Sequence, residues 1–309
     1  ANRLKTISLN PNGNALVIDG DHVEGDGITD QHRAEFKSFK KKTNSLAQFF
    51  RSAYQISPPR IRTDNKKDLL GLMQTGWNLR TMGNEGMTDM LRFIAINVFD
   101  LFDEYFDNDF IKGSLAIDAV LGNHLGPRTN NSVITYLHTL TGEIDGVQGA
   151  YAIPKGGMSS YTDALKNSAE KLGVRIVLDS HVEQIIVDDN GKASGVKFAE
   201  GNEVSADVVV SGIDPKSTFM CLVGARHLEA GFVHKINNVR MRGNASKLHL
   251  ALSGLPSFNG VDEKDIGQRI VISPTMQYLE QAFDYTKYQH CSDQLPMEIT
   301  IPSIHDSSL

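Results

Sequence analysis

The hydrophobic pattern of the sequence changes twice along the chain, and these changes limit the folds that the chain can adopt. Residues 29–126 carry apolar side chains at steps of three and four, which is the spacing of amphipathic helices. Short apolar or alternating runs, separated by turns that contain Asn and Gly, precede and follow this block, and such runs predict strands. The sequence therefore predicts a mixed α/β (α+β) fold, with a helix-rich block between sheet-forming regions.

The predicted elements follow from capping and turn residues. Thr29 or Asp30 can begin the first helix, and Ser57-Pro58-Pro59 ends that segment, because proline cannot continue a helix. The turn Asn10-Pro11-Asn12-Gly13-Asn14 predicts an N-terminal hairpin. Further helices are expected at 69–79, 88–102, 132–140, 159–172, 215–223 and 228–237. Strands are expected at 6–9, 15–18, 175–178, 181–187, 193–198, 204–210, 247–252, 269–272 and 297–301.

The composition argues against several classes of protein. The chain has 309 residues with 31 Lys and Arg against 37 Asp and Glu, a net charge of −6, whereas a nucleic-acid-binding protein needs a basic face. Two cysteines, Cys221 and Cys291, exclude a disulfide scaffold and a metal site made of cysteines alone. No apolar run is long enough for a transmembrane helix, and we expect no signal peptide within the chain.

Two charged clusters suggest sites, although a solvated helix face explains each of them more simply. Asp103 and Asp107 are spaced by one helical turn, as in the Mg²⁺-binding clusters of prenyl-diphosphate enzymes. A magnesium-dependent isoprenoid enzyme is therefore one alternative function. Lys37 and Lys40-Lys41-Lys42 would suit a nucleic acid or an anionic membrane, but the acidic net charge favours a solvated face.

The segment Pro154-Lys155-Gly156-Gly157-Met158 precedes a helix that Ser159 or Ser160 can cap. Two glycines without Cβ atoms allow a ligand or another backbone to approach the N-terminus of this helix, where free N–H groups favour anions. A plain tight turn explains the same residues equally well. The segment predicts either an anion-binding turn or a simple connection.

A larger set of ordered segments resembles the phytoene-desaturase-like FAD-dependent oxidoreductases. The set comprises Pro154–Met158, Asp163–Leu165, Gly173-Val174, His181-Val182, Gly195-Val196, Ala206–Ser211, Asp214-Pro215 and Lys247–Leu252. Upstream, Phe93, Leu121–Asn123, Gly126-Pro127 and Leu137-His138 narrow the resemblance to the branch of pyridine nucleotide-disulfide oxidoreductase domain-containing protein 2. The resemblance extends over nearly the whole chain.

The resemblance implies part of a glutathione-reductase-type FAD-binding fold and a helix-rich substrate domain with a mixed sheet. It assigns 1–150 to the substrate domain with its N-terminal hairpin, 151–245 to a partial FAD-binding domain, and 246–309 to the returning strands of the substrate domain. Within the FAD-binding part, Val182 is expected to lie against the adenine. The turn at Gly156 and Gly157, and the strand end at Ser211 and Gly212, are expected to pass near the cofactor.

Two FAD-binding segments of the family have no counterpart in this sequence. These are the N-terminal glycine loop that holds the pyrophosphate, Gly-x-Gly-x-x-Gly, and a glycine-rich segment near the C-terminus. We therefore expect a fragment of a larger flavoprotein, or else a natural truncation, that carries no FAD and is inactive when purified alone. The alternative is a non-catalytic binding or regulatory protein that keeps the fold.

The substrate that the resemblance implies is a hydrophobic small molecule, isoprenoid-like in character. We expect the apolar helices of residues 91–121 and the strand 247–252 to line its pocket. No catalytic residue can be assigned; His138 and His249 are candidates because histidine titrates near neutral pH, but a structural role is simpler. A peripheral membrane contact and a homodimer are further expectations. The location, cytoplasmic or organellar (as in mitochondria), stays open.

Overall fold

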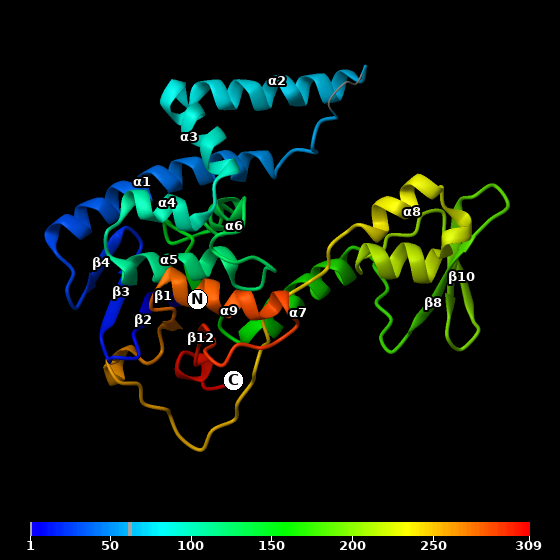
Figure 1. Ribbon diagram of the computed structural model, residues 1–309. Coiled ribbons are helices and arrows are strands. Elements are labelled where there is room, and N and C mark those ends of the chain that lie inside the picture. Colours follow the sequence, from blue (N-terminus) through cyan, green and yellow to red (C-terminus); the bar gives the residue numbers. More distant parts are fainter. Residues whose placement is uncertain (1, 61–63) are drawn as a thin grey trace. The chain divides into compact units, whose positions relative to one another are not determined.

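The computed structural model describes residues 2–60 and 64–309 (Figure 1). These residues form two compact units, each with its own contacts. The first unit combines Ala1–Thr162 with Gly243–Leu309, and the second unit is Asp163–Arg242. The division therefore falls between Thr162 and Asp163, inside the helix α7 (Gly157–Lys171), and not in a loop. The assignment of 151–245 to an FAD-binding domain stays a prediction.

A five-stranded mixed sheet organises the first unit. Its strand order is β12-β11-β2-β3-β4, and β11 runs parallel to β2 while the other neighbours are antiparallel. The strands are β2 (Thr6–Leu9), β3 (Ala15–Asp19), β4 (His22–Gly25), β11 (Arg269–Ile272) and β12 (Met297–Ile299). The predicted N-terminal hairpin is confirmed, and the sheet also joins strands from opposite ends of the sequence.

Two smaller strand pairs lie in the same unit. Strand β1 (Asn2–Leu4) pairs antiparallel with β7 (Tyr151–Ile153), and β5 (Glu143–Ile144) pairs with β6 (Val147–Gln148). The first of these pairs brings the beginning of the chain next to the segment that enters α7. It was not expected from the sequence, because runs of two or three residues carry no measurable alternation.

Helices cover one face of the five-stranded sheet. Figure 1 shows α1, α4, α5 and α6 gathered near the sheet strands β2–β4, and α9 lies close to α5. The helices are α1 (Asp30–Ala53), α4 (Val98–Tyr105), α5 (Asp109–Val120), α6 (Ser132–Thr139) and α9 (Met276–Lys287). The shared core combines sheet residues such as Leu16, Val23 and Val271 with these helices.

Aromatic side chains fill the centre of this core. The ring of Phe39 lies 5.5 Å from that of Phe102, 5.0 Å from that of Phe106 and 6.1 Å from that of Tyr136. Most of these pairs meet edge to face, the geometry in which the positive ring edge meets the negative ring face. The cluster fixes α1 against α4 and α6.

The helix ends are set by polar caps, and one cap corrects a sequence prediction. Thr29 caps α1 with a capping box. The Thr29 hydroxyl oxygen accepts from the His32 backbone N–H, and the His32 Nδ1 atom accepts from the Thr29 backbone N–H. The single helix expected at 88–102 is instead two helices, α3 (Gly83–Ala95) and α4. Asn97 causes the break, because its side chain accepts from the Asp100 N–H at 2.9 Å and starts α4.

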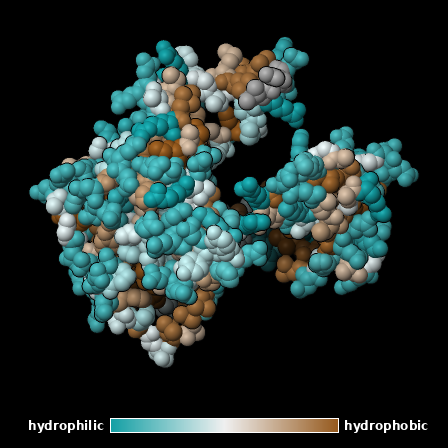
Figure 2. Space-filling model, viewed as in Figure 1, coloured by the Kyte–Doolittle hydropathy of each residue, from teal (hydrophilic) through white to brown (hydrophobic). Residues whose placement is uncertain are grey.

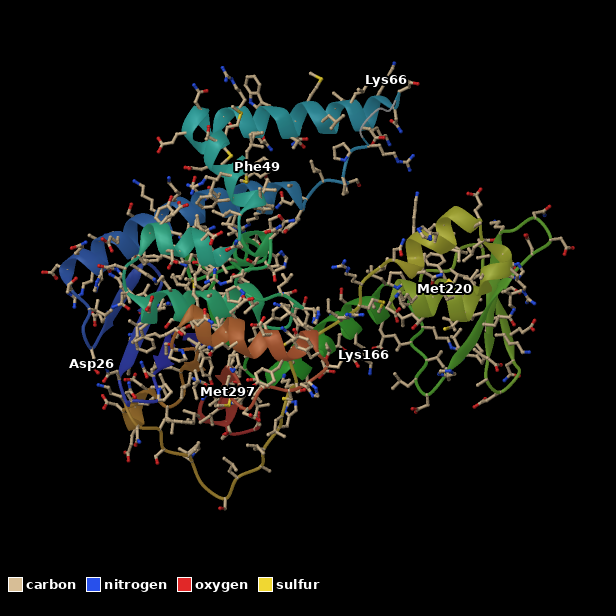
Figure 3. All side chains as sticks on the ribbon, viewed as in Figure 1. Asp26, Phe49, Lys66, Lys166, Met220 and Met297 are labelled. Atoms are coloured by element: carbon tan, nitrogen blue, oxygen red, sulfur yellow. The ribbon has the colours of Figure 1, made fainter. Side chains whose placement is uncertain are left out.

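The second unit contains the C-terminal part of α7, a small antiparallel sheet and short helical segments. The strand order is β10-β9-β8, from β8 (Val182–Val187), β9 (Ala193–Phe198) and β10 (Glu203–Ser205). A π-helical segment, η1 (Ser217–Gly224), which includes Met220 of Figure 3, and the helix α8 (Ala230–Asn237) lie near the positions that the sequence predicts. The rings of Phe219 and Phe232 meet edge to face at 4.9 Å and hold these two segments together.

Three predicted strands are wrong as strands in this structure. Residues 175–178 and 247–252 have no regular secondary structure, and of the strand expected at 204–210 only its first two residues form a strand, as part of β10. Their apolar side chains, among them Leu178, Val210 and Leu248, are strongly exposed. The pattern of apolar residues is that of strands, but a strand needs a partner for its backbone N–H and C=O groups, and none pairs with these runs in the described residues.

A buried guanidinium connects the sheet of the first unit to a helix. Arg269 on β11 is 1% exposed and donates to Asp118 on α5 at 2.6 Å and to Glu298 on β12 at 2.8 Å. Its guanidinium carbon also lies 4.1 Å from the ring centre of Tyr151 on β7. Burial alone would lower the pKa of Arg269, but the charges of Asp118 and Glu298, the phenol of Tyr151 and the hydrogen bond to Asp118 together outweigh burial and raise the pKa, so Arg269 stays charged.

We predict that Arg269→Met lowers the free energy of unfolding by about 3–5 kcal/mol, because it leaves Asp118 and Glu298 without their shared cation. Urea unfolding followed by circular dichroism measures the change. Arg51→Met is the control, since Arg51 and Glu143 form an exposed ion pair worth less than about 1 kcal/mol. An equal decrease in the free energy of unfolding in the two variants would show that the buried network stabilises the protein no more than an exposed ion pair does.

Candidate functional site

The first unit contains a small polar cavity between the helices and the sheet. Its volume is about 50 Å³, and the space continues into open solvent. Lys40 from α1, Asp118 from α5 and Tyr136 from α6 line it, together with Arg3 from β1 and Tyr151 from β7. Titratable side chains from five separate elements therefore line one small space that is open to solvent. A cavity of this size holds about one or two water molecules, or a group of similar size.

Lys40 is the most unusual of these side chains. It is 6% exposed and forms no ion pair in the part of the chain that the structure describes. Burial lowers the pKa of its ammonium to about 8, although the charges of Asp118 and Asp21 act in the opposite direction. A buried amine with this pKa is partly neutral near neutral pH, which makes it able to donate, accept or release a proton.

Tyr136 offers a second polar group without a partner. Its side chain is 1% exposed, and its hydroxyl has no hydrogen-bond partner among the described residues. The neighbouring Thr43 hydroxyl donates to the backbone carbonyl of Phe39 instead, at 3.1 Å. Burial raises the pKa of Tyr136 well above its usual value, so the phenol stays protonated and remains a donor.

The other charges at the cavity already have partners. Asp118 accepts from Arg269 at 2.6 Å, and the Tyr151 hydroxyl lies 3.4 Å from the same carboxylate oxygen. Arg3 donates to Asp19. Burial raises the pKa of Tyr151, so this phenol also stays protonated. Lys40 and Tyr136 are consequently the donors that the cavity leaves unused.

Sequence reasoning missed this site by treating Lys37 and Lys40–Lys42 as one solvated face. Lys37 and Lys41 are exposed and Lys42 pairs with Asp89 at 2.8 Å, but Lys40 is buried. The helical spacing carried the signal, because position 40 lies four residues after Phe36 and seven before Ala47, both of them buried on the core face. A lysine at a helix position that faces the core therefore indicates a buried charge.

The turn at Gly156 and Gly157 is occupied by residues near the end of the chain. The Gly156 N–H donates to the Asp306 carboxylate, and a Cβ on Gly157 would lie 2.7 Å from the side chain of Leu309. Gly157 has a φ of +67°, so α7 starts there rather than at Ser159 or Ser160. The bond from Ser308 and the Gly156 N–H lower the pKa of Asp306 to about 2. The carboxylate of Asp306 therefore already accepts from the Gly156 N–H, and the Gly157 N–H donates to the carbonyl of Pro154.

The other three predicted FAD contacts lie in the second unit. Val182 begins β8, which is an edge strand of its sheet and can offer backbone groups to a ligand. The Ser211 hydroxyl lies 2.7 Å from that of Thr218, and nothing lies within 4 Å of the position of a Cβ on Gly212. The contacts of these three residues with FAD stay a prediction. The turn at Gly156 does not fit a phosphate, because Asp306 takes its place.

The remaining candidates do not form sites. Asp103 accepts from Lys112 at 2.7 Å, and Asp107 lies beyond the end of α4 and pairs with His32 at 3.0 Å. Both carboxylates thus have side-chain partners, and no group of three potential metal ligands occurs in the described residues. His138 contacts the Tyr54 hydroxyl at 3.0 Å on the surface, and His249 is exposed. Neither histidine lines the cavity.

No helix within residues 2–60 and 64–309 combines the length and the apolar character needed to cross a membrane. This agrees with the expectation from the sequence for the part of the chain that the structure describes.

The chain belongs to the family described as flavin containing amine oxidoreductase, whose sequence pattern matches residues 83–289. The match includes helices of the first unit and the whole of the second unit. It confirms the predicted family and the mixed α/β fold class. The family is flavin-containing by its description, which agrees with the expected cofactor.

Relatives support the same family. The mouse (Mus musculus) pyridine nucleotide-disulfide oxidoreductase domain-containing protein 2 is 29% identical over 238 residues, which cover 74% of this chain and 41% of that protein. The phytoene desaturase (neurosporene-forming) of Rhodobacter capsulatus is 25% identical over 175 residues, 56% of this chain and 32% of that protein. The chain thus spans less than half the length of these relatives. No solved structure matches the chain.

We predict that the stability of the protein depends on the protonation of Lys40. Its pKa is about 8 in the folded state and 10.5 in the unfolded state, so the unfolded chain binds more protons between these values. The free energy of unfolding should therefore rise as the pH rises from about 8 to about 10, by up to about 3 kcal/mol.

The measurement is urea unfolding at several pH values, for the wild type and for Lys40→Met. The variant should lack this rise and should be the more stable protein near pH 7, because it removes a buried charge. Lys41→Met, at an exposed position on the same helix, is the matched control and should keep the rise. An identical pH profile in the wild type and Lys40→Met would contradict the interpretation.

Proposed function

We propose that the chain is part of an FAD-dependent oxidoreductase that acts on a hydrophobic, isoprenoid-like substrate. The observation that carries the proposal is that residues 83–289 match a family of flavin-containing oxidoreductases. Its relatives include proteins named as phytoene desaturases and a 4,4'-diapolycopene oxygenase of Methylomonas, the last 43% identical over 60 residues. Phytoene is an apolar hydrocarbon, which supports an apolar substrate here.

The unpaired apolar runs support the view that this chain works as part of a larger flavoprotein. Residues 174–178 and 208–213 are dominated by Val, Ile and Leu, as in parallel strands that are buried on both faces. In this structure their side chains are exposed, with Leu178 at 75% and Val210 at 88%. Partner strands from an FAD-binding sheet would cover them. The isolated chain is expected to form homodimers or larger assemblies through the same surfaces.

The flavin, when bound, would accept a hydride from a C–H bond of the substrate. Of the residues of this chain expected beside it, Val182 would lie against the adenine, and Ser211 and Gly212 would pass near the cofactor. A non-catalytic binding protein is the second candidate. The observation that favours it is the turn at Gly156, where Asp306 meets the N–H group that an anion would need.

A contact with a membrane surface is a further part of the proposal. The helix α2 (Lys66–Thr81) has no buried residue, and its side chains Leu70, Met73 and Trp77 are 65%, 71% and 70% exposed at helical spacing. Figure 2 shows hydrophobic surface on this helix, and Lys66 marks its beginning in Figure 3. Lys66, Lys67 and Arg80 lie near the ends of this stripe, where cations meet anionic lipid headgroups.

We predict that the purified chain contains no FAD. The two phosphates of FAD need N–H groups at a glycine loop, and the sequence contains no Gly-x-Gly-x-x-Gly. The absence of flavin bands in the absorbance spectrum, before and after heating, is the expected result. The longer protein that includes the glycine loop should carry one FAD per chain. If that longer protein also lacks FAD, the binding-protein alternative is correct. Stoichiometric FAD in this chain would contradict the fragment interpretation.

We also predict that the chain binds vesicles of phosphatidylcholine and phosphatidylserine through α2. Trp77 is the single tryptophan, so a blue shift of its emission reports its entry into lipid. Met73→Glu should weaken binding about tenfold or more, because it replaces apolar surface by a charge. Leu165→Glu on α7, where Leu165 is 55% exposed, is the matched control. Equal binding by the wild type and Met73→Glu would exclude this contact.

A further inference from the structure

The cavity of the first unit has two donors that the protein itself does not use. Lys40 forms no ion pair in the described residues, and the Tyr136 hydroxyl has no hydrogen-bond partner there. Buried polar groups are normally satisfied, because an unpaired donor costs free energy relative to its hydration in water. The Tyr136 hydroxyl on α6 is such a donor, and Lys40 on α1, which is 6% exposed and has no ion-pair partner in the described residues, lines the same space. A ligand or ordered water that accepts from both would remove this cost.

The charges around the cavity indicate which acceptor fits. Asp118 is paired with Arg269, and Arg3 is paired with Asp19. Lys40 is thus the charge lining the cavity without a counter-ion in contact, among the residues that the structure describes. An ammonium and a phenol that both donate are complementary to a carboxylate, which accepts at both oxygens and balances the charge. The volume of about 50 Å³ accommodates such a group but no ring.

We propose that this cavity is a carboxylate-binding site, in which the Lys40 ammonium and the Tyr136 hydroxyl hold the two oxygens of a small organic anion. The site goes beyond the oxidoreductase function and does not depend on it. Because the space continues into solvent, the carboxylate can belong to a small free anion or to the end of a longer apolar molecule. These two sources share one chemistry and are separated by experiment.

The experiment measures the binding of acetate and of octanoate to the full 309-residue chain by calorimetry, with acetamide as a neutral comparison. We expect at least one carboxylate to bind and acetamide not to bind. Octanoate binding much more tightly than acetate identifies an apolar carboxylic acid as the ligand; equal binding identifies a small free anion. Binding of neither carboxylate, or equal binding of acetamide, overturns the proposal.

Two conservative variants place the ligand in this cavity. Lys40→Met and Tyr136→Phe keep the size of the side chain, and each should weaken carboxylate binding about tenfold or more. Lys41→Met, which removes the same charge from an exposed position of α1, should bind as the wild type does. Circular dichroism and urea unfolding verify that each variant is folded. Unchanged affinity in folded Lys40→Met overturns the proposal.

The pH dependence provides a readout that a purely structural role would not show. Binding should be constant below pH 8 and should fall about tenfold for each pH unit above it, as Lys40 loses its proton. The phenols of Tyr136 and Tyr151 keep their protons in this range, because burial raises both pKa values. The other charged groups around Lys40 are Asp21 and Asp118, whose charges raise its pKa, and Arg3, which lines the same cavity; Arg269 is the ion-pair partner of Asp118. Binding that does not change between about pH 7 and about pH 10 overturns the role of Lys40.

Discussion

The ion network of Arg269 is the interaction on which the first unit depends most. One buried guanidinium contacts a helix, α5, and a second strand, β12, and its face covers the ring of Tyr151 on β7. An unpaired charge in this place would be strongly destabilising, so the partners must assemble together. The network thereby fixes the position of α5 relative to the sheet, and with it the position of Asp118 at the wall of the cavity.

The same arrangement explains why the cavity is polar. The carboxylate of Asp118 pairs with Arg269, and its charge also opposes the effect of burial on the pKa of Lys40. The Arg269 ion network therefore lies next to the cavity that Lys40 and Tyr136 line. Natural proteins retain such groups in cores when they specify an arrangement or bind a ligand, since an apolar core would be simpler.

Much of the fold was predictable, because local chemistry determines it. The N-terminal hairpin, the Thr29 cap and the helix at 132–140 follow from turn residues, caps and periodicity, and the structure confirms them. The break at Asn97 was missed because an Asn can stand inside a helix or cap the next one. The runs at 175–178 and 247–252 have the composition of strands. A run forms a strand only where a neighbouring strand accepts its backbone hydrogen bonds, and the run's own sequence does not show whether that neighbour is present.

The site was less predictable than the fold. Family resemblance directed attention to Gly156 and Val182, whereas Lys40 and Tyr136 lie far apart in the sequence and meet only through the packing of α1 on α6. Nothing in the local sequence shows that Asp306 will reach Gly156, which lies 150 residues away. Contacts of this kind depend on the whole topology.

The parallel pairing of β2 with β11 has a consequence for how the protein is made. Thr6 and Arg269 are separated by 263 residues, yet they are neighbours in one sheet. At about 5–20 residues per second, a ribosome needs roughly 10–50 seconds to synthesise the intervening chain. During this time the hairpin of β2 and β3 exposes an unpaired edge, and the second unit can fold before the first is complete. The edge of β2 that β11 pairs with is therefore covered only after the whole second unit has been synthesised.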